Sequence, residues 1–303
     1  MTLPTCNACG AAVRTALPTV RDPRSGERFS ILRCTSCGLG HTWPQPEDLA
    51  PYYGESYHGG RHGASADFCT RRRLRFLRQA AGAGPGRLVD VGCGDGTFLA
   101  SARTAGWNVA GTELNPALPR SLGLRIERDL AELADLAPFD VATMWHSLEH
   151  LTDPRASLAQ LRGMLRPGGT LLVAVPDAGG WQARAFGGAW LHLDVPRHLF
   201  HFDRRSLTGL LTSLGFQVER EWHAELEYDV LGWSQSALNS VSHTPNVFFD
   251  TVTRRPRTTT VPRAAAAAVG GLVLSAASAP AVAASVLARR GGTLVVAARA
   301  AGG

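Results

Sequence analysis

Four cysteines near the start of the chain have the residue type and spacing of a metal site. Two C-x-x-C-G segments begin at Cys6 and Cys34, and 24 residues separate Cys9 from Cys34. Each segment can wrap two thiolates around one ion, the following glycine allows a tight turn, and four soft thiolates favour tetrahedral zinc. We therefore predict a zinc ribbon whose structural ion is bound by Cys6, Cys9, Cys34 and Cys37.

The segment between the cysteine pairs has the pattern of a β-hairpin. Residues 12–14 and 28–32 are strand-like, and the turn-forming sequence D-P-R-S-G lies between them at residues 22–26. No basic-then-apolar leader is visible at the start of the sequence, so we expect a cytoplasmic protein, in which disulfides are disfavoured.

A second group of polar residues surrounds a glycine-rich turn. The apolar run 88–91 contains Asp90 and enters G-C-G-D-G at residues 92–96, after which a helical pattern follows. Another apolar run ends in Glu113, 21 residues beyond Gly92, which is the spacing at which an acid on the second strand reaches ribose hydroxyls. The dinucleotide pattern G-x-G-x-x-G fails at Thr97. Carboxylates beside the turn oppose a pyrophosphate and suit a ligand with a sulfonium and an ammonium group.

The residues around this turn closely resemble motif I of class I S-adenosylmethionine-dependent methyltransferases, as V-D-V-G-C-G-D-G-T-F at residues 89–98. Phe139-Asp140, L-E-H at residues 148–150 and L-R-P-G-G at residues 165–169 match the bacterial small-molecule branch in order and spacing. The segment W-L-H-L-D-V-P-R-H-L-F-H-F (190–202) and the pair Tyr52-Tyr53 resemble a bacterial subgroup with an N-terminal zinc ribbon. The likeness covers residues 5–225 and a final strand at 293–298.

This resemblance implies a set of residues that hold the methyl donor. Its glycine-rich turn and the acid after the second strand would contact S-adenosylmethionine, and the acid after the third strand would lie near the adenine. The set is Asp90, Gly92, Gly94, Glu113, Asp129 and Trp145.

Alternating strand and helix patterns predict the fold that positions these residues. We expect an α/β, Rossmann-like, seven-stranded, mostly parallel sheet with helices on both faces, plus the small zinc ribbon. Ligands of such sheets bind at the carboxyl ends of the strands, where the motifs fall. The predicted ranges are ribbon 1–45, linker and basic helix 46–85, methyltransferase core 86–250, basic and Ala-rich helical insertion 251–290, and final strand and tail 291–303.

Several histidines are candidates for the chemical step. The protein mainly has to align the acceptor with the methyl group, and a hydroxyl or carbon acid gains from a general base of near-neutral pKa. We predict His146, just past the fourth strand, as the base or orienting group, with His150 and His198 as further catalytic candidates. One alternative is that the histidines only cap helices or pin loops. Another is a second metal at His146, Glu149 and His150, completed by His198 or His201.

The charge is strongly segregated along the chain. All 31 basic residues are arginine, and the net charge is +6. Residues 88–250 hold 12 Arg and 19 acids, a balance of −7, whereas residues 1–87 (12 Arg, 6 acids) carry +6 and residues 251–303 (7 Arg, no acid) carry +7. The acidic middle suits a cationic donor and argues against nucleic acid. The arginine-rich segment 71–78 reads either as a basic lid for an anionic handle on a small-molecule substrate or as a solvated helix face.

Residues 264–288 form an uncharged, Ala-rich stretch after the basic segment 254–263. Its length would satisfy a membrane span, but Gly270, Gly271 and Pro280 interrupt it and few large apolar residues are present. We predict a helical pair broken near residues 278–280 that packs on the core, on another subunit or on a membrane surface.

Together these patterns predict methyl transfer from S-adenosylmethionine to oxygen or carbon of a small-molecule acceptor: a natural product, a sugar or a lipid-linked compound. Two alternatives remain open. One is an RNA-modifying methyltransferase that grips RNA through the ribbon and the basic helix. The other is a cofactor-binding scaffold without catalysis.

Overall fold

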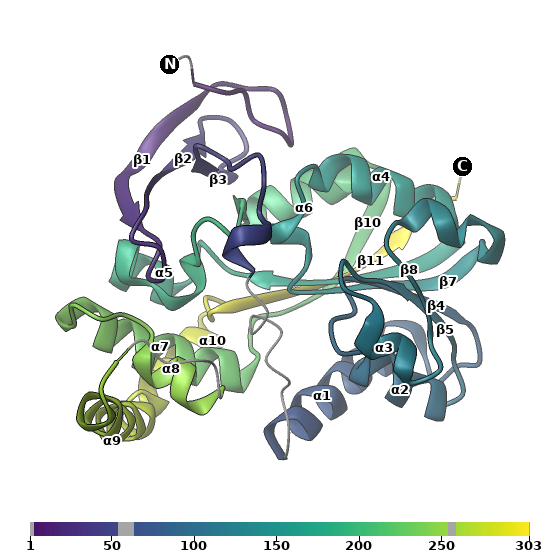
Figure 1. The fold of residues 1–303 in the computed structure, drawn as a ribbon. Coiled ribbons are helices and arrows are strands. Elements are labelled where there is room, and N and C mark those ends of the chain that lie inside the picture. The colour runs from purple at the N-terminus through teal and green to yellow at the C-terminus, as the bar shows by residue number, and fades with distance from the viewer. Residues whose placement is uncertain (1–2, 54–63, 254–258, 303) are drawn as a thin grey trace. The chain divides into compact units, whose positions relative to one another are not determined.

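The computed structural model describes residues 3–53, 64–253 and 259–302 and divides into two compact units (Figure 1). The ribbon unit combines Met1–Gly59, Pro176–Leu207 and Trp222–Leu294. The seven-stranded unit combines Gly60–Val175, Thr208–Glu221 and Val295–Gly303. The ranges predicted from sequence are contiguous, whereas each unit is built from three separate segments.

The seven-stranded unit contains the predicted Rossmann-like sheet, with strand order β10-β11-β8-β7-β4-β5-β6. The pairs β4–β5, β4–β7, β5–β6 and β7–β8 are parallel. The strands are β4 (Arg87–Val91), β5 (Asn108–Thr112), β6 (Arg125–Glu127), β7 (Phe139–Trp145), β8 (Leu165–Pro176), β10 (Phe216–Trp222) and β11 (Thr293–Ala300).

Helices cover both faces of this sheet, as the alternating pattern predicts (Figure 1). On one side are α1 (Ala64–Ala81), α2 (Thr97–Thr104) and α3 (Ala117–Ser121), and on the other are α4 (Pro154–Met164) and α6 (Arg204–Ser213). Residues 171–175 of β8 are fully buried, because a parallel strand with helices on both faces has no solvated side. The 3-10 helices of this unit are η2 (Leu130–Leu136) and η3 (Leu148–His150).

Helix α4 shows how the local sequence sets the helix ends. The Asp153 carboxylate accepts a hydrogen bond of 2.9 Å from the Ala156 N–H, and Pro154 occupies the first turn. Both features stabilise a helix N-terminus, because the first N–H groups lack helical partners and proline needs none.

The packing of α1 is less simple than that of a solvated helix face, which is one of the two readings of its arginine-rich segment. Leu77 is buried, but so are Phe76 and Arg72, and Phe68 is about half exposed. The Arg72 guanidinium lies 5.9 Å from the centroid of the Phe68 ring. A cation can take an aromatic face as its partner, so the arginine packs inward while the phenylalanine covers it from outside.

The ribbon unit contains the predicted hairpin within an antiparallel four-stranded sheet of order β1-β2-β3-β9. The Asp22 carboxylate accepts a 3.1 Å hydrogen bond from the Ser25 N–H and so shapes the turn of this hairpin. The strands are β1 (Val13–Arg21), β2 (Arg28–Cys34), β3 (Gly40–Trp43) and β9 (Phe200–His201), and the 3-10 helices are η1 (Ala50–Tyr52), η4 (Gly187–Ala189) and η5 (Leu191–Leu193).

A buried arginine connects the hairpin to the segment that follows β8. The Arg197 side chain is 1% exposed and donates to Asp194 Oδ1 at 2.6 Å and to Asp22 Oδ1 at 3.1 Å. Apolar residues of the same two regions pack together: Val20, Phe29, Ile31, Trp190, Leu193 and Val195. The P-R-H segment therefore has a structural role through its arginine, which the sequence motif alone does not reveal.

The remaining helices of the ribbon unit are α5 (Trp181–Phe186), α7 (Leu226–Val241), α8 (Val247–Val252), α9 (Val261–Ala277) and α10 (Ala279–Leu287). The predicted helical pair with a break near residues 278–280 is confirmed, with a bend of 46° between α9 and α10. In the described part of the chain, no helix alone has the length and hydropathy of a membrane span, although α9 and α10 meet that test as a bent pair. The basic residues 254–258 lie outside the described residues.

Candidate functional site

The glycine-rich turn joins β4 to α2 at the carboxyl edge of the sheet. The N–H groups of Gly92 and Cys93 both donate to the Thr112 carbonyl at 2.9 Å, which ties the turn to the end of β5. Gly92 has φ 73°, and a Cβ there would lie 2.6 Å from the Ser147 Cβ. Only glycine fits this position, because any side chain would meet both backbone strain and a clash.

Glu113 follows β5 and is fixed against the same turn. Its Oε2 accepts a 2.8 Å hydrogen bond from the Gly94 N–H, and its Oε1 lies 3.4 Å from the Asn115 nitrogen. The residue is 8% exposed. A carboxylate held in this way has remaining acceptor capacity for ribose hydroxyls, which is the role that the spacing predicts.

Asp90 lies in β4, below the turn, and is almost completely buried. The Thr143 hydroxyl on β7 donates to its Oδ1 at 2.6 Å. Burial raises the pKa of Asp90 to about 7, and the Thr143 hydrogen bond and the positive charge of Arg73 oppose this rise. The aspartate thus links two strands beneath the turn, and its direct contact with a ligand stays a prediction.

Asp129 lies after β6 at the same edge of the sheet. It is exposed and caps η2, where its Oδ1 accepts a 2.8 Å hydrogen bond from the Ala131 N–H. The cap fixes the carboxylate in place, and its predicted position near an adenine stays a prediction.

Trp145 ends β7 and packs between two helices. Its ring stacks on Phe76 of α1 at 6.3 Å between centroids and meets the edge of Phe98 of α2 at 5.5 Å. The Arg73 guanidinium lies 5.2 Å from the centroid of its ring. Its buried Nε1 has no hydrogen-bond partner among the described residues. The sequence offered no sign that Arg73, among the many arginines of α1, would be the one beside Trp145 and Asp90.

His146 is held at the carboxyl end of β7 in a left-handed conformation, with φ 54°. Its N–H donates to the Ala174 carbonyl at 2.9 Å, and its Nδ1 lies 3.6 Å from the Glu149 Oε1. Glu149 is 1% exposed, and His150, the last residue of η3, is half-buried. Non-glycine residues rarely adopt positive φ, and such strain concentrates at functional sites. The structure therefore holds His146 in a strained conformation, with its ring beside the carboxylate of Glu149 from the L-E-H motif.

His198 belongs to the ribbon unit and is buried there. Its Nδ1 is 2.9 Å from the His192 carbonyl, and its Nε2 is 4.0 Å from the Asp194 Oδ2. Because a carbonyl oxygen only accepts, the proton of the neutral ring lies on Nδ1 and the lone pair on Nε2. Its joint action with His146 and His150 stays a prediction.

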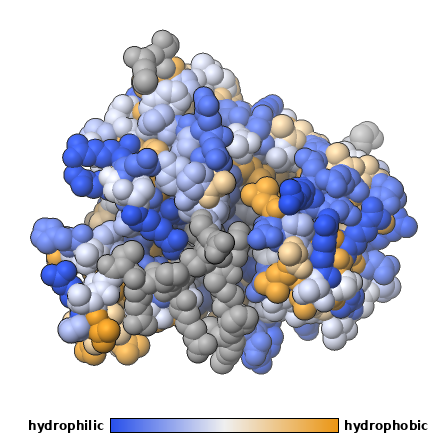
Figure 2. All heavy atoms as spheres, viewed as in Figure 1, coloured by the Kyte–Doolittle hydropathy of each residue, from blue (hydrophilic) through white to orange (hydrophobic). Residues whose placement is uncertain are grey.

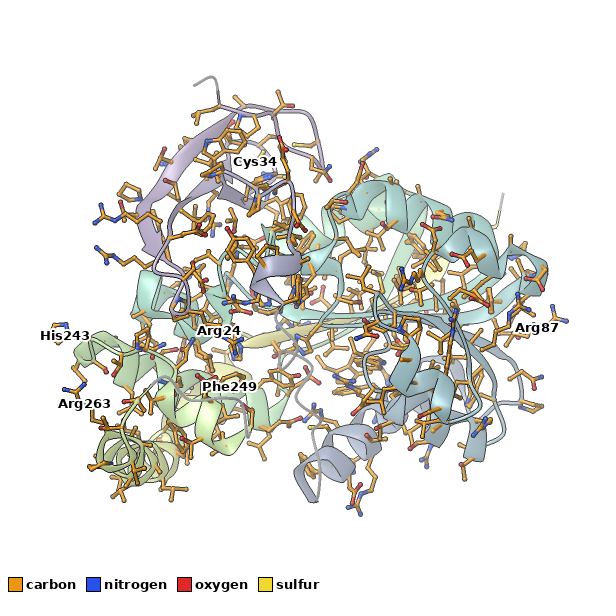
Figure 3. All side chains as sticks on the ribbon, viewed as in Figure 1. Arg24, Cys34, Arg87, His243, Phe249 and Arg263 are labelled. Carbon is orange, nitrogen blue, oxygen red and sulfur yellow. The ribbon has the colours of Figure 1, made fainter. Side chains whose placement is uncertain are left out.

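The four predicted cysteine ligands come together in the ribbon unit, near Cys34 in Figure 3. All four sulfurs lie within 4.8 Å of one another, with Cys6–Cys37 at 3.6 Å and Cys9–Cys34 at 3.5 Å. Sulfurs 2.3 Å from a tetrahedral zinc would be about 3.8 Å apart, so the cluster fits such an ion. Burial alone would raise the pKa of Cys34, but hydrogen bonds from the N–H groups of Cys37 and Ser36 lower it to about 6.

Comparisons with known proteins identify the family of this chain. A methyltransferase domain family matches residues 61–221, which is more than half of the chain. The ubiquinone biosynthesis O-methyltransferase of Ralstonia nicotianae is 27% identical over 202 residues, covering 61% of this chain and 82% of that protein. A SAM-dependent methyltransferase structure from Archaeoglobus fulgidus has a TM-score of 0.49 at 16% identity, covering 82% of this chain and 99% of the other. The 1,6-didemethyltoxoflavin-N1-methyltransferase of Burkholderia thailandensis has a TM-score of 0.46 at 17% identity, covering 90% and 96%.

The parallel sheet, the glycine-rich turn at its carboxyl edge and the family match lead to one conclusion. The chain belongs to the methyltransferase domain family and is a class I S-adenosylmethionine-dependent methyltransferase.

Proposed function

We propose that this protein methylates a hydroxyl oxygen of a small-molecule acceptor, with S-adenosylmethionine bound over the turn at residues 92–96. The observation that carries the proposal is the fixed carboxylate of Glu113, which the Gly94 N–H holds at 2.8 Å beside the turn. The relatives named ubiquinone biosynthesis O-methyltransferases favour oxygen over carbon or nitrogen as the methylated atom.

The donor supplies a methyl group on a positively charged sulfur, which is an activated leaving group. Glu113 would accept hydrogen bonds from its ribose hydroxyls, Gly92 and Gly94 would allow close approach of the backbone, and Asp129 would lie near its adenine. Asp90 would support the glycine-rich turn by linking β4 to β7 through its hydrogen bond with Thr143.

His146 is the group that we propose as the general base. It would take the acceptor's hydroxyl proton while the acceptor oxygen forms the new bond to the methyl carbon, and the electrons of the broken C–S bond would remain on sulfur. The buried Glu149 carboxylate, with an oxygen 3.6 Å from His146 Nδ1, would stabilise the resulting imidazolium. We assign His150 and His198 to positioning of the acceptor.

Arg73 is the proposed site for a carboxylate or another anionic group of a ligand. Its guanidinium lies over Trp145, and its charge acts on Asp90, so it contributes positive potential at the edge of the sheet that carries the glycine-rich turn. The anion could come from the donor's amino-acid end or from an anionic handle on the acceptor. The Arg73→Met variant separates the two sources. If Arg73 binds the donor's amino-acid end, the variant has a higher KM for the donor, and if Arg73 binds a handle on the acceptor, it has a higher KM for the acceptor.

A structural zinc ion is the proposed occupant of the cysteine cluster. Cys6, Cys9, Cys34 and Cys37 would supply all four ligands, which leaves no open position for substrate. The ion would therefore hold the ribbon unit together and take no part in methyl transfer.

The fate of a labelled methyl group tests the proposed acceptor class. The full-length protein is incubated with methyl-labelled S-adenosylmethionine and, separately, with a bacterial small-molecule extract, total RNA and total protein. Label in an alkali-stable small-molecule ether supports the proposal. Label in RNA would identify an RNA methyltransferase instead, and donor binding without any transfer would identify a scaffold.

Replacing His146 tests the proposed base. Because general-base catalysis contributes about 10²–10⁴-fold, His146→Ala should lower kcat by that order while the donor's Kd stays the same. His243→Ala changes an exposed histidine, labelled in Figure 3, and serves as the control that keeps full activity. A His146→Ala enzyme with wild-type kcat across the pH range would remove His146 from the chemical step.

A further inference from the structure

Helix α9 exposes most of its large apolar side chains instead of burying them. Val269, Leu272 and Val273 are 64%, 65% and 63% exposed, and they lie on one stripe because their spacing follows the helical repeat. Figure 2 shows hydrophobic surface over α9. Single exposed apolar residues are ordinary, but a contiguous exposed stripe marks an interaction site.

The inner side of α9 is made of small residues. The helix packs on α7 and α8, and Ala264 and Gly271 are buried there. A Cβ on Gly271 would lie 2.2 Å from the Cγ of Phe248, so close packing against α8 requires glycine at this position. This arrangement inverts that of a helix in water, where the large apolar side chains face the core.

The charged residues of α9 and α10, and those directly after α10, are all arginines. No aspartate or glutamate follows Asp250 in the sequence. The exposed Arg263 lies in the first turn of α9, as Figure 3 shows, and the exposed Arg289 and Arg290 follow α10. A face with apolar residues and flanking arginines complements a surface that is apolar inside and anionic outside.

We propose that the outer face of α9 binds the surface of an anionic membrane, with Val269, Leu272 and Val273 in the acyl boundary and the arginines at the headgroups. A symmetric contact with a second copy of the chain fits less well. It would bring the arginines beside this face of two copies together, and neither α9 nor α10 carries an acid that could pair with them. The proposal does not depend on the identity of the methyl acceptor.

Vesicle sedimentation of the full-length protein tests this proposal. Vesicles of phosphatidylcholine alone are compared with an equal mixture of phosphatidylcholine and phosphatidylglycerol. We expect binding to the mixed vesicles, which rising salt weakens, and little binding to phosphatidylcholine alone. Leu272→Glu should lower the partition coefficient at least tenfold, and Arg263→Ser about fivefold, which corresponds to about 1 kcal/mol per arginine near the surface.

Matched controls keep the test decisive. Leu226→Glu changes another leucine of the ribbon unit, 53% exposed and outside α9, and should bind vesicles as the wild type does. Each variant is first shown to keep the wild-type affinity for S-adenosylmethionine and the wild-type circular dichroism spectrum, and Val269→Ser replaces Leu272→Glu if the latter does not fold. Three results would overturn the proposal: no binding of the wild type to anionic vesicles, an equal loss in Leu226→Glu, or self-association of the wild type that Leu272→Glu abolishes.

Discussion

The two units of the molecule hold their polar residues in different ways. In the seven-stranded unit, Glu113 is tied to the backbone of the glycine-rich turn, above strands whose apolar residues are almost wholly buried. In the ribbon unit, a small sheet relies on side chains that bind one another: the cysteine cluster and the pair of aspartates around Arg197. Apolar burial distributes stability over many residues, whereas a metal site or a buried ion pair concentrates it in a few.

The largest expected effect is loss of the proposed zinc ion from the ribbon unit. Removal of zinc by a chelator, or the Cys37→Ser variant, should abolish hydrogen-exchange protection in β1, β2 and β3, because structural zinc contributes an apparent 10–16 kcal/mol, roughly, in small zinc-binding peptides. Protection in β4 and β5 should persist. Zinc content is measured by elemental analysis, and exchange by mass spectrometry.

Cys69→Ala is the matched control, since Cys69 is a buried cysteine outside the cluster. It should retain one zinc per chain. Full protection of β1–β3 in metal-free protein would show that the ribbon unit does not depend on the ion. It would contradict the claim that a metal site concentrates the stability of this unit in a few residues.

The next effect in size concerns the buried arginine. Arg197→Met should destabilise the ribbon unit by about 3–5 kcal/mol, because it leaves the Asp22 and Asp194 carboxylates without their cation. Denaturant unfolding measures the change. Arg125→Met breaks an exposed pair with Asp135 and should leave the midpoint unchanged. Equal midpoints for Arg197→Met and the wild type would mean that apolar packing alone holds the hairpin in place.

A pH-dependent effect is expected in the seven-stranded unit. Burial raises the pKa of Asp90 from 3.8 to about 7. Between these two pH values the folded state therefore holds a proton that the unfolded state has lost. The stability that protonated Asp90 contributes is complete below about pH 4 and is lost as the pH rises toward 7. The free energy of unfolding falls over this range by at most about 1.4 kcal/mol per pH unit, and above pH 7 Asp90 no longer changes it. Asp90→Asn should remove this slope from the exchange rates of β4 and β7. Parallel pH profiles for the variant and the wild type would contradict the assignment.

Local patterns predicted most of the fold and the cluster of four cysteines. The alternation of apolar runs and turns predicted the sheet, and the cysteine spacing predicted the cluster that the structure assembles. These features depend on residues that are close together in the sequence, so a local pattern is enough to predict them.

Contacts between distant segments could not be predicted in the same way. Arg197 meets Asp22 across 175 positions, and Thr143 meets Asp90 across 53. The partner of each buried charge depends on which segments the fold brings together, and no local pattern encodes that choice. The same reason explains why the sequence did not show which arginine of α1 is buried, and the structure shows that it is Arg72.

Calorimetric titration with S-adenosylmethionine tests the central assignment most directly. The wild-type protein should bind one equivalent, and Glu113→Ala should bind about tenfold to a hundredfold more weakly, because a hydrogen bond to a charged group contributes about 1.5–3 kcal/mol. Glu132→Ala, which changes an exposed acid of η2, should bind as the wild type does. No binding by the wild type, or equal affinities for the wild type and Glu113→Ala, would contradict the placement of the donor at the glycine-rich turn.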